Sequence, residues 1–467
     1  MKNNIIIFGM GNYGKNTYWK LKDEYNIVAF ADNNMKLAET TYEGVEVILG
    51  KNLMYQDLDN IDIVICTQHY YEIENQLIEM RIMDYYVMIE GLLYHTSPYE
   101  TMMPVELNRD VYYKKEMKER NILFVQNAAC IRTHKIATLM KDIGYKVFLI
   151  YTLAPPFGAY LQYVDVYDKI WGFSSAKGLV DFISNSDFDV VHCSNEPDTL
   201  ANIVSMSNKP VIADTHDMQS IRSNVEIDAL ILEYLANTFC LGNMYESDKV
   251  AEIAQQKYDT EAKKVFFVEN YVMDQVNIVH PYEKLSTLDN EIHCVYEGGI
   301  VGNEKQNHRY FDEMWKKITD EGIHIHFYSQ SDIERCRRLE NISSFIHYEG
   351  SMGGVDLIRE MTKYDCGLVL FNSTDSNRIH LEANSINKVY EYINSGLPLL
   401  SAGINSLNEF VKKNKVGIEL DFSKNIREQI VEACKLEVSP DFLRDNKYTM
   451  KSYGSHLANF YSNISND

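Results

Sequence analysis

The chain has 467 residues, which at roughly 150 residues per domain indicates about three domains. It carries 45 basic and 67 acidic side chains, so its formal net charge is −22 with histidine neutral. This acidic balance excludes nucleic acid as an electrostatic partner, because phosphate contacts need a basic surface. The apolar fraction of 45% is ordinary for a globular protein and excludes bulk disorder.

The eight cysteines are spaced too widely to form a CxxC pair, so the sequence predicts neither a zinc ribbon nor a thioredoxin motif. Several lie in apolar runs, which favours buried, reduced thiols and a cytoplasmic location. The first apolar run is too short for a signal peptide, and no run of about 18 apolar residues exists. We therefore expect a cytoplasmic protein without a transmembrane segment.

Three successive segments each begin with a short apolar run followed by helical patterns, which is typical of parallel α/β units. We therefore predict an α/β fold with three Rossmann-like domains. A last helix either packs back on an earlier domain or is a plain amphipathic terminus. The predicted organisation is a Rossmann-like domain over 1–97, a linker over 98–117, α/β domains over 118–285 and 286–440, and a C-terminal helix over 441–467 that packs back on 118–285.

The predicted strands follow from the apolar runs between turn residues. In the first domain they lie near 4–8, 27–31, 62–66 and 85–89. In the second they lie near 121–125, 146–151, 188–192, 210–213, 238–241 and 265–268. In the third they lie near 293–297, 323–328, 345–348, 366–370 and 398–401.

A glycine-rich turn follows the first predicted strand. Gly9 permits the tight turn, Gly11 lets a pyrophosphate approach the backbone, and Gly14 lets the following helix pack on the strand. Asp32 ends the second predicted strand, 21 residues after Gly11, where a ribose-binding acid is expected. We predict a site here for NAD, a nucleotide-sugar or another nucleotide. A Rossmann unit that keeps these glycines only for turn and packing reasons is the alternative.

This first segment resembles, over roughly 1–95, the small Rossmann-like domains fused to bacterial polysaccharide and amino-sugar enzymes. The resemblance is carried by the glycine-rich turn and by Asp32 with Asn33 and Asn34 after the second strand. Such domains often lack catalytic residues of their own. The segment shows no obvious Tyr-x-x-x-Lys pair, so dehydrogenase chemistry is not favoured.

Residues 371–403 carry the strongest chemical pattern. A predicted strand ends in a polar loop, and a helix begins near 385–386 and ends at Gly396. The unpaired N–H groups and the dipole at the helix N-terminus favour the binding of an anion. Lys388 lies in the first turn, where a cation opposes the helix dipole unless an anion is nearby, and Glu391 shares its face. A phosphate near Lys388 and a ribose diol near Glu391 account for both residues.

The stretch Asn387-Lys388-Val-Tyr-Glu391-Tyr-Ile-Asn-Ser-Gly396-Leu-Pro398 resembles the donor-site helix of glycosyltransferases with the GT-B fold. The resemblance covers roughly 120–465. It implies that the last two domains form a two-lobed GT-B transferase, with 118–285 as the acceptor lobe and 286–440 as the donor lobe. It also implies that Glu391 binds the ribose of a nucleotide-sugar and that Lys388 contacts the diphosphate. The donor-binding residues predicted on this basis are Asn387, Lys388, Glu391, Gly299, Lys305 and Glu382.

Two departures from the family pattern bear on mechanism. Many retaining members carry two glutamates separated by seven residues, whereas Glu382 and Glu391 are separated by eight. The choice between retaining and inverting chemistry therefore stays open. The arginine that usually follows the glycines at 298–299 is absent, so neutralisation of the donor phosphates rests on Lys305, Arg309 or Lys388.

His216 and Asp217 follow the strand predicted at 210–213 and are the candidates for catalysis. We expect His216 to hydrogen-bond the donor sugar or the acceptor hydroxyl, or to act as general base. A structural loop histidine is the alternative. His324 and His326 alternate along one predicted strand and are interpreted as packing residues. Weaker strand-end candidates are Arg132, His134, Lys135, His192 and Glu196.

No cluster shows convincing metal-ligand spacing, which favours a metal-independent reaction in which a helix dipole and lysines stabilise the leaving diphosphate. The leading prediction is a glycosyltransferase that moves a hexose or related sugar from a nucleotide-diphosphate sugar to a glycan, lipid-linked or protein acceptor, in bacterial-type glycan or cell-surface polysaccharide synthesis. One alternative is a nucleotide-sugar binding or sensing protein. The others are a nucleotide-sugar isomerase and an NAD-dependent oxidoreductase that uses the first domain.

Overall fold

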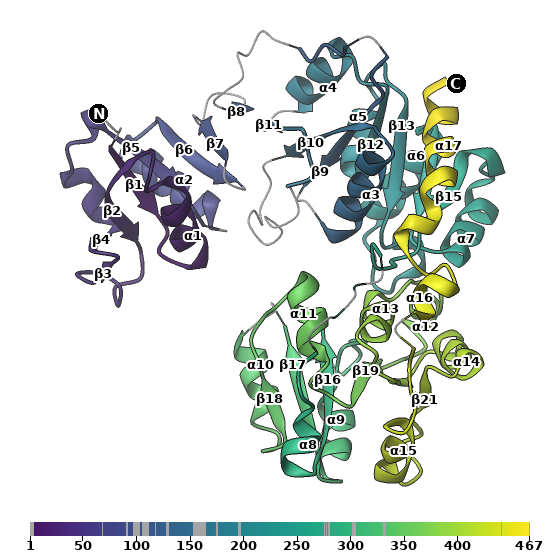
Figure 1. Cartoon of the computed structure of the whole chain (residues 1–467). Helices are drawn as coiled ribbons and strands as arrows, with labels where there is room; N and C mark the ends of the chain where they lie inside the picture. The colour runs from purple at the N-terminus through teal and green to yellow at the C-terminus, as the bar shows by residue number, and fades with distance from the viewer. Residues whose placement is uncertain are drawn as a thin grey trace.

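The structure is a computed structural model of the chain. It shows an N-terminal α/β domain and two further α/β lobes that lie one above the other (Figure 1). The described residues are 4–67, 69–89, 92–96, 103–104, 112–116, 118–127, 130–152, 165–173, 176–194, 198–274, 276, 278, 281–300, 305–329, 333–439 and 441–466.

The N-terminal domain is built on an eight-stranded sheet with the order β3-β4-β2-β1-β5-β6-β7-β8. Its centre is parallel, and the β3–β4, β6–β7 and β7–β8 pairs are antiparallel. The apolar run of β1 is buried from its second residue on. The elements are β1 Asn4–Phe8, α1 Asn12–Leu21, β2 Asn26–Asp32, β3 Thr41–Tyr42, β4 Val45–Leu49, η1 Gly50–Tyr55, η2 Leu58–Asn60, β5 Ile61–Ile65, α2 Tyr70–Glu79, β6 Tyr85–Ile89, β7 Leu92–Thr96 and β8 Met103–Pro104.

The middle lobe is a seven-stranded parallel sheet with the order β11-β10-β9-β12-β13-β14-β15. Every residue of the central strand β9 is buried, as expected for a parallel sheet covered by helices on both faces. The elements are β9 Asn121–Gln126, α3 Ile131–Asp142, β10 Lys146–Thr152, β11 Lys169–Phe173, α4 Ala176–Asn185, β12 Val190–Ser194, α5 Thr199–Val204, β13 Val211–Thr215, η4 Gln219–Ile221, α6 Ile227–Phe239, β14 Gly242–Tyr245, α7 Asp248–Tyr258, η5 Ala262–Lys264 and β15 Val265–Phe267.

The third unit, called the C-terminal lobe here, is a six-stranded parallel sheet with the order β18-β17-β16-β19-β20-β21. One face of β16 and β17 packs into an aromatic and aliphatic core around Trp315. The elements are α8 Leu285–Asp289, β16 Ile292–Glu297, α9 Asp312–Thr319, β17 Ile323–Tyr328, α10 Ile333–Glu340, β18 Ile346–Tyr348, α11 Gly354–Met361, β19 Cys366–Leu370, α12 Arg378–Ala383, α13 Asn387–Asn394, β20 Leu399–Ala402, α14 Asn405–Asn414, β21 Gly417–Glu419, α15 Ile426–Ala433 and α16 Phe442–Asp445.

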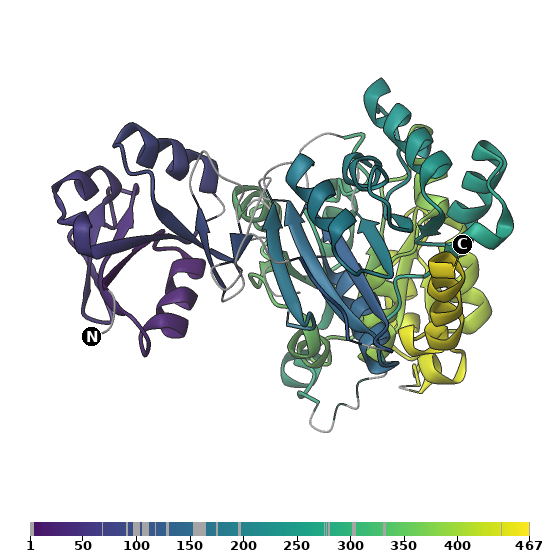
Figure 2. The ribbon, with the colours of Figure 1, turned by 90° about the horizontal axis from the view of Figure 1, so that it is seen from above.

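The end of the chain returns to the middle lobe. After η6 (Met450–Tyr453), helix α17 (Gly454–Asn466) runs along the side of the middle sheet (Figure 2). The Tyr461 hydroxyl lies 2.7 Å from Nδ1 of His192 on β12, and Leu457, Phe460 and Tyr461 are buried.

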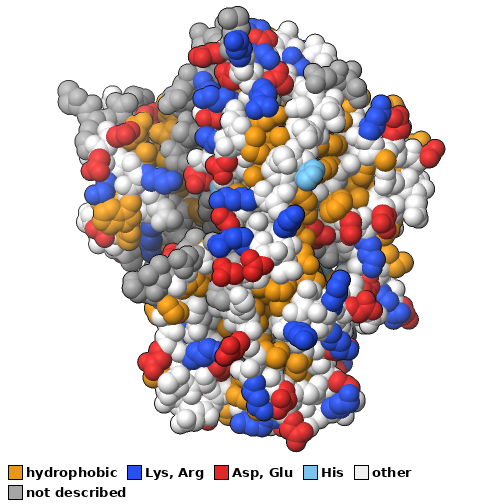
Figure 3. Space-filling model, turned by 45° about the vertical axis from the view of Figure 1, so that its right-hand side comes forward, with side chains coloured by type: hydrophobic (Ala, Val, Ile, Leu, Met, Phe, Trp, Pro, Cys, Tyr) orange, Lys and Arg blue, Asp and Glu red, His pale blue; other side chains and the backbone are white. Residues whose placement is uncertain are grey.

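Most predicted strands lie within two residues of the observed ones. The strand expected near 238–241 was wrong: α6 runs to Phe239, and β14 begins at Gly242. The apolar residues at this point form the end of α6 and the turn after it, and they are not part of a strand. Strands β4, β11 and β21 were not predicted, and neither were β3, β7 and β8, which pair antiparallel at the two sides of the N-terminal sheet. On the face drawn in Figure 3, acidic and basic side chains are mixed among apolar areas, so the described residues there form no single-sign basic patch.

Candidate functional site

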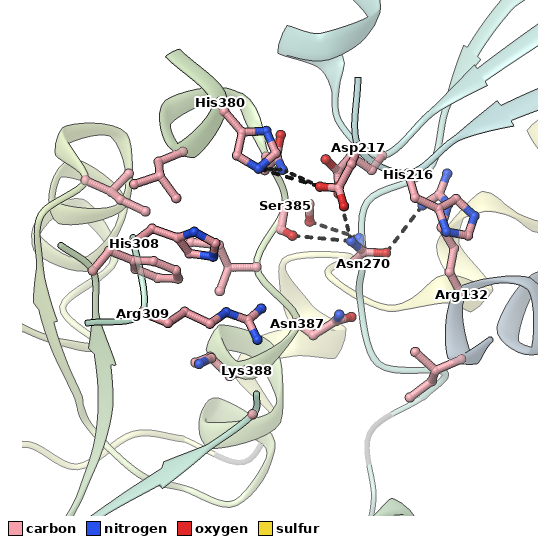
Figure 4. Close-up of a pocket in the computed structure, with 18 of the residues that line it drawn as sticks. Arg132, His216, Asp217, Asn270, His308, Arg309, His380, Ser385, Asn387 and Lys388 are labelled. Atoms are coloured by element: carbon pink, nitrogen blue, oxygen red, sulfur yellow. Dashed lines mark hydrogen bonds and ion pairs between the residues drawn. The ribbon is translucent and has the colours of Figure 1, made fainter. Parts of the chain in front are cut away.

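A cavity of about 570 Å³ lies between the middle and C-terminal lobes. Because parallel strands present their carboxyl ends at one sheet edge, loops after β9, β13, β16 and β19 converge there. Figure 4 shows side chains from both lobes directed into this space. The residues that line it are Cys130, Ile131, Arg132, His216, Asp217, Arg222, Glu246 and Asn270 from the middle lobe and its connection, and Glu297, Gly298, Asn307, His308, Arg309, Phe371, His380, Leu381, Asn384, Ser385, Ile386, Asn387, Lys388 and Ile404 from the C-terminal lobe.

Two cations meet on the C-terminal wall of the cavity. Lys388 lies in the first turn of α13, is only 7% exposed, and holds its Nζ 3.9 Å from the centre of the Tyr296 ring. Arg309 lines the same wall, and the two side chains lie next to each other in Figure 4. Within the described part of the chain, neither forms an ion pair. Two neighbouring cations that no described carboxylate pairs with directly are costly to hold in a largely enclosed wall, so this wall favours an anion.

Gly298 makes room for Lys388. Its φ is +131°, and a Cβ added there would lie 3.1 Å from Lys388 Nζ and 3.3 Å from the Tyr296 hydroxyl. A side chain at this position would therefore displace the cation and strain the backbone.

Several polar atoms on the same wall have no partner among the described residues. They are Nε of Arg309, Nδ1 of His380 and the amide oxygens of Asn384 and Asn387, all buried from solvent. Buried polar groups are nearly always hydrogen-bonded, so their concentration around one cavity indicates a polar ligand.

Two carboxyl groups face each other beside this wall. Burial, and then the charge and hydrogen bond of Glu391, raise the pKa of Glu297 well above its ordinary value, which favours a protonated Glu297 beside Glu391. The main-chain N–H of Glu297 donates to the Tyr392 hydroxyl at 2.7 Å, which ties the end of β16 to α13. Glu297 lines the cavity and Glu391 does not. Lys135 of α3 is buried in the field of both carboxyls.

A buried charge network supports the middle-lobe wall. Nη2 of Arg132 lies 2.8 Å from Oδ1 of Asp214, and the same guanidinium donates to the main-chain oxygens of Tyr245 and Val268. Asp214 also accepts from His192 at 3.2 Å. Although burial opposes its charge, Arg132 and then His216 hold the pKa of Asp214 well below its usual range. One arginine thus joins β13, β14 and the segment after β15.

His216 lies between the carboxylate of Asp214 and the thiol of Cys130. Its Nε2 lies 3.2 Å from Oδ2 of Asp214, and its Nδ1 lies 4.0 Å from Sγ of Cys130. Burial works against the charged ring, but Cys130 and Asp214 raise the pKa of His216 well above its ordinary value. For the thiol, burial again works against charge, while His216 and Thr133 lower the pKa of Cys130 to about 7. Both ring nitrogens of His216 thus already face a partner, Asp214 on one side and Cys130 on the other.

Asp217 is the half-exposed carboxylate of the cavity. It accepts from Nδ2 of Asn384 at 3.2 Å, and His380 Nε2 lies 3.6 Å away (Figure 4). Asn270 connects the lobes nearby, since its main-chain N–H donates to the Ser385 hydroxyl at 2.9 Å and its side-chain amide donates to the Ser385 carbonyl. Asp217 and Asn270 therefore both reach the segment before α13 from the side of the middle lobe.

The structure brings together four of the eight predicted catalytic and donor-binding residues on the cavity wall: His216, Asp217, Asn387 and Lys388. Four lie off it. Glu391 reaches it only through Glu297, and the carbonyl of Gly299 accepts from the Tyr296 hydroxyl. Lys305 is exposed and pairs with Glu313 at 3.3 Å. Glu382 accepts the Asn405 and Ser406 N–H groups at 2.7 and 2.9 Å, which caps α14.

The structure places the weaker candidates in different surroundings. Arg132 lines the cavity but is committed to Asp214, and His192 is fully buried behind it. His134 points to Asp165 at 2.8 Å, away from the lining residues. Glu196 lies outside the described residues.

Sequence reasoning missed Cys130, Glu297, Asn270, His308 and His380 as lining residues. Glu297 is the last residue of a predicted strand and Cys130 follows another, and position at a strand end was the one signal that could have selected them. His380 and Asn270 come from segments whose approach only the packing of the lobes decides.

The glycine-rich turn of the N-terminal domain has the expected backbone. Gly9 has φ +116°, and a Cβ on Gly14 would lie 1.7 Å from the Gly9 carbonyl oxygen. The space beside Gly11 is open to 4 Å. Asp32 accepts the main-chain N–H groups of Met10 and Asn34, each at 2.8 Å, and so also holds the turn. A nucleotide at these four residues stays a prediction.

The fold defines a class. Two facing lobes with parallel α/β sheets form the GT-B arrangement, and the prediction of an α/β fold whose last two domains form a GT-B pair is confirmed. The described residues include no helix long and apolar enough to cross a membrane.

Comparison with family models gives two matches. Residues 300–439 match the glucosyltransferase 3-like C-terminal domain, and residues 1–88 match the C2185-like N-terminal domain. No curated protein sequence matches the chain.

Solved structures resemble the chain at low sequence identity. A glycosyltransferase from Rickettsia africae aligns with a TM-score of 0.53 and 14% identity, over 74% of this chain and 99% of the other. AviGT4, a glycosyltransferase involved in avilamycin A biosynthesis, gives 0.48 and 13%, over 74% and 98%. Anabaena HepE in complex with UDP-glucose gives 0.49 and 12%, over 74% and 98%. The likeness to the first structure shows the fold.

Proposed function

We propose that the protein is a glycosyltransferase that moves a sugar from a nucleotide-diphosphate sugar to an acceptor hydroxyl. One observation carries the proposal: Lys388 and Arg309 meet at the start of α13 in a cavity between two lobes, where neither forms a direct ion pair with a described carboxylate and the neighbouring Glu297–Glu391 pair offsets their two charges only in part. A diphosphate supplies the missing negative charge, and the helix N-terminus adds its dipole. The match of 300–439 to a glucosyltransferase 3-like domain supports the same lobe as donor lobe.

The proposed chemistry follows from charge. As the bond between sugar and diphosphate breaks, negative charge grows on the leaving oxygens, and Lys388, Arg309 and the α13 dipole stabilise it. These groups supply the neutralisation that a divalent ion supplies elsewhere, so we expect no gain in turnover when Mg²⁺ is added to chelator-treated enzyme. A large gain would contradict this point.

The acceptor side of the proposal rests on Asp217. Its carboxylate lines the cavity from the middle lobe, whereas both ring nitrogens of His216 already face Asp214 and Cys130. We therefore assign proton acceptance from the acceptor hydroxyl to Asp217 and the positioning of the β13 loop to His216. Asp217→Asn should lower kcat by at least tenfold with little change in donor affinity. Unchanged kcat would contradict this assignment.

The carboxyl pair of Glu297 and Glu391 is the part of the C-terminal lobe that we expect to bind the ribose. Glu297 lines the cavity and its raised pKa favours the protonated carboxyl, so its proton can bond Glu391 while its other oxygen accepts a hydrogen bond from a ribose hydroxyl. The nucleotide base, the sugar, the acceptor and the stereochemical outcome lie beyond this proposal. A glycan, lipid-linked or protein acceptor in bacterial-type polysaccharide synthesis remains the expected context.

The experiment compares two lysines of one lobe. Binding and hydrolysis of UDP-, GDP-, ADP- and dTDP-sugars are measured for the wild type, Lys388→Met and Lys305→Met. Lys388→Met should weaken binding of the preferred donor at least tenfold. Lys305→Met should leave binding unchanged, because Lys305 lies on the surface beside Glu313. Equal loss in both variants, or in neither, would overturn the proposal. Donor binding without hydrolysis or transfer to any acceptor pool would favour the sensing alternative.

A further inference from the structure

Four histidines lie on one face of the C-terminal sheet, away from the cavity. His293 on β16 stands opposite His324 on β17, and His326 on β17 stands opposite His347 on β18. The rings of His293 and His324 stack with centroids 4.5 Å apart, as do those of His326 and His347. The chain has 13 histidines, so nearly a third of them gather on three neighbouring strands. The prediction that His324 and His326 are packing residues does not account for this arrangement.

Three of these rings have one nitrogen held by a carboxylate. Nε2 of His293 lies 3.0 Å from Oδ2 of Asp289, and Nδ1 of His326 lies 2.7 Å from Oε1 of Glu349. Nε2 of His324 contacts Glu291. A carboxylate accepts a proton, so each contact places the N–H on the outer nitrogen and leaves the other nitrogen with a lone pair. A carboxylate behind the ring is what orients a metal-ligating histidine in known sites.

The inner nitrogens then face one another. Nδ1 of His293 and Nε2 of His326 are 2.9 Å apart. If both outer nitrogens carry the hydrogen, both inner ones carry lone pairs, which repel at this distance unless a cation lies between them. An extra proton would make one ring an imidazolium, but His293 and His326 are both buried and stack against other imidazole rings, where a charged ring is costly. A metal ion satisfies both lone pairs and leaves the rings neutral.

We propose that His293, His324 and His326 bind one divalent transition-metal ion, with zinc as the best match. One ring nitrogen from each of the three lies within 4.8 Å of the other two. Neutral imidazole is a preferred ligand of Zn²⁺, and three protein ligands leave one position open. His347 is within reach of that position, since its Nε2 lies 2.8 Å from Nδ1 of His324.

A metal ion could reach this site from solvent and would link neighbouring elements of the C-terminal lobe. His293 and His326 are buried, whereas Asp289 and Glu291 on the rim are exposed. An ion bound there joins β16 to β17 and, through Asp289, to the end of α8. Along β16, His293 is four residues before Glu297, which is roughly 13 Å at the usual rise per residue. The ion would therefore support the lobe without touching the donor.

The test uses the full chain, stripped with chelator and then titrated with Co²⁺ and with Zn²⁺ alone. The wild type should bind one equivalent, and Co²⁺ should give the strong visible absorption of a four-coordinate nitrogen site. His324→Ala should lose that equivalent. Glu291→Gln, which alters only an exposed carboxylate, should weaken binding about 10- to 100-fold while the fold is kept. His456→Ala, on the exposed side of α17, is the matched control and should bind like the wild type.

The outcomes separate cleanly. Loss of the bound equivalent in His324→Ala and weaker binding in Glu291→Gln, with His456→Ala unchanged, would support the site. No bound equivalent in the wild type would overturn it, and so would equal binding by the wild type and both site variants. Because the readouts are stoichiometry and absorption, they do not depend on the proposed transferase activity.

Discussion

At the scale of single residues, the position of Lys388 on the C-terminal wall of the cavity depends on the neighbouring Gly298. Gly298 adopts a positive φ and approaches Lys388 Nζ so closely that a Cβ would lie 3.1 Å away. Gly298→Ala should therefore displace the cation and strain the turn by about 1–3 kcal/mol. We expect at least tenfold weaker binding of nucleoside diphosphates, measured by calorimetry. Gly353→Ala is the control, because nothing lies within 4 Å of its added Cβ. Equal affinities in both variants would contradict the role of Gly298.

The Cys130–His216 contact gives a second residue-scale prediction. The lowered pKa of Cys130, about 7, makes much of it thiolate at neutral pH, whereas burial raises the pKa of Cys66 to about 12. Alkylation of Cys130 by iodoacetamide, mapped by mass spectrometry, should therefore rise with pH around a midpoint near 7. His216→Asn removes the partner that lowers the pKa of the Cys130 thiol, so it should move that midpoint upward. A midpoint near 8.5 in the wild type would contradict the pairing.

The site was predictable to the extent that one segment defines it. Asn387 and Lys388 share a helix start that a single stretch of sequence describes, and both line the cavity. Lys305 was predicted to bind the donor, but it lies on the surface and pairs with Glu313. The sequence pattern around Lys305 does not indicate this contact. The Glu297–Glu391 pair joins residues 94 positions apart, and only the packing of α13 on β16 brings them together.

At the scale of elements, α14 begins at a carboxylate supplied by α12. Glu382 accepts the N–H groups of Asn405 and Ser406, and although burial opposes it, these hydrogen bonds lower its pKa. Glu382→Gln should reduce stability by about 1 kcal/mol in urea unfolding and leave donor affinity unchanged. Because the folded pKa is depressed, the wild-type advantage should be full above about pH 4.3 and should shrink as pH falls below it. A variant as stable as the wild type at pH 7 would contradict the capping role.

The elements themselves were largely predictable, since buried parallel strands appear as continuous apolar runs. β9 and β19 are such runs, and both are fully buried. The three-residue strand β21 offers too short a signal, and β11 mixes Lys169 with apolar residues at the sheet edge. The end of α6 was mistaken for a strand because its apolar residues continue to Phe239.

At the scale of the whole molecule, the account places chemistry where two sheets turn their carboxyl ends toward each other. The middle lobe contributes a rigid charge network around Asp214, and the C-terminal lobe contributes the cations. Asn270 and Ser385 connect the lobes directly beside the cavity. The imidazole cluster braces the far end of the same C-terminal sheet, so donor binding and metal binding occupy opposite ends of β16.

The most direct test of the central claim is a crystal structure of the full chain with its preferred nucleoside diphosphate. We predict that the diphosphate lies between Lys388 Nζ, Arg309 and the first N–H groups of α13, with the ribose toward Glu297. Density for the nucleotide only at the turn formed by Gly9, Gly11 and Gly14, with the interlobe cavity holding none at saturating ligand, would contradict the account.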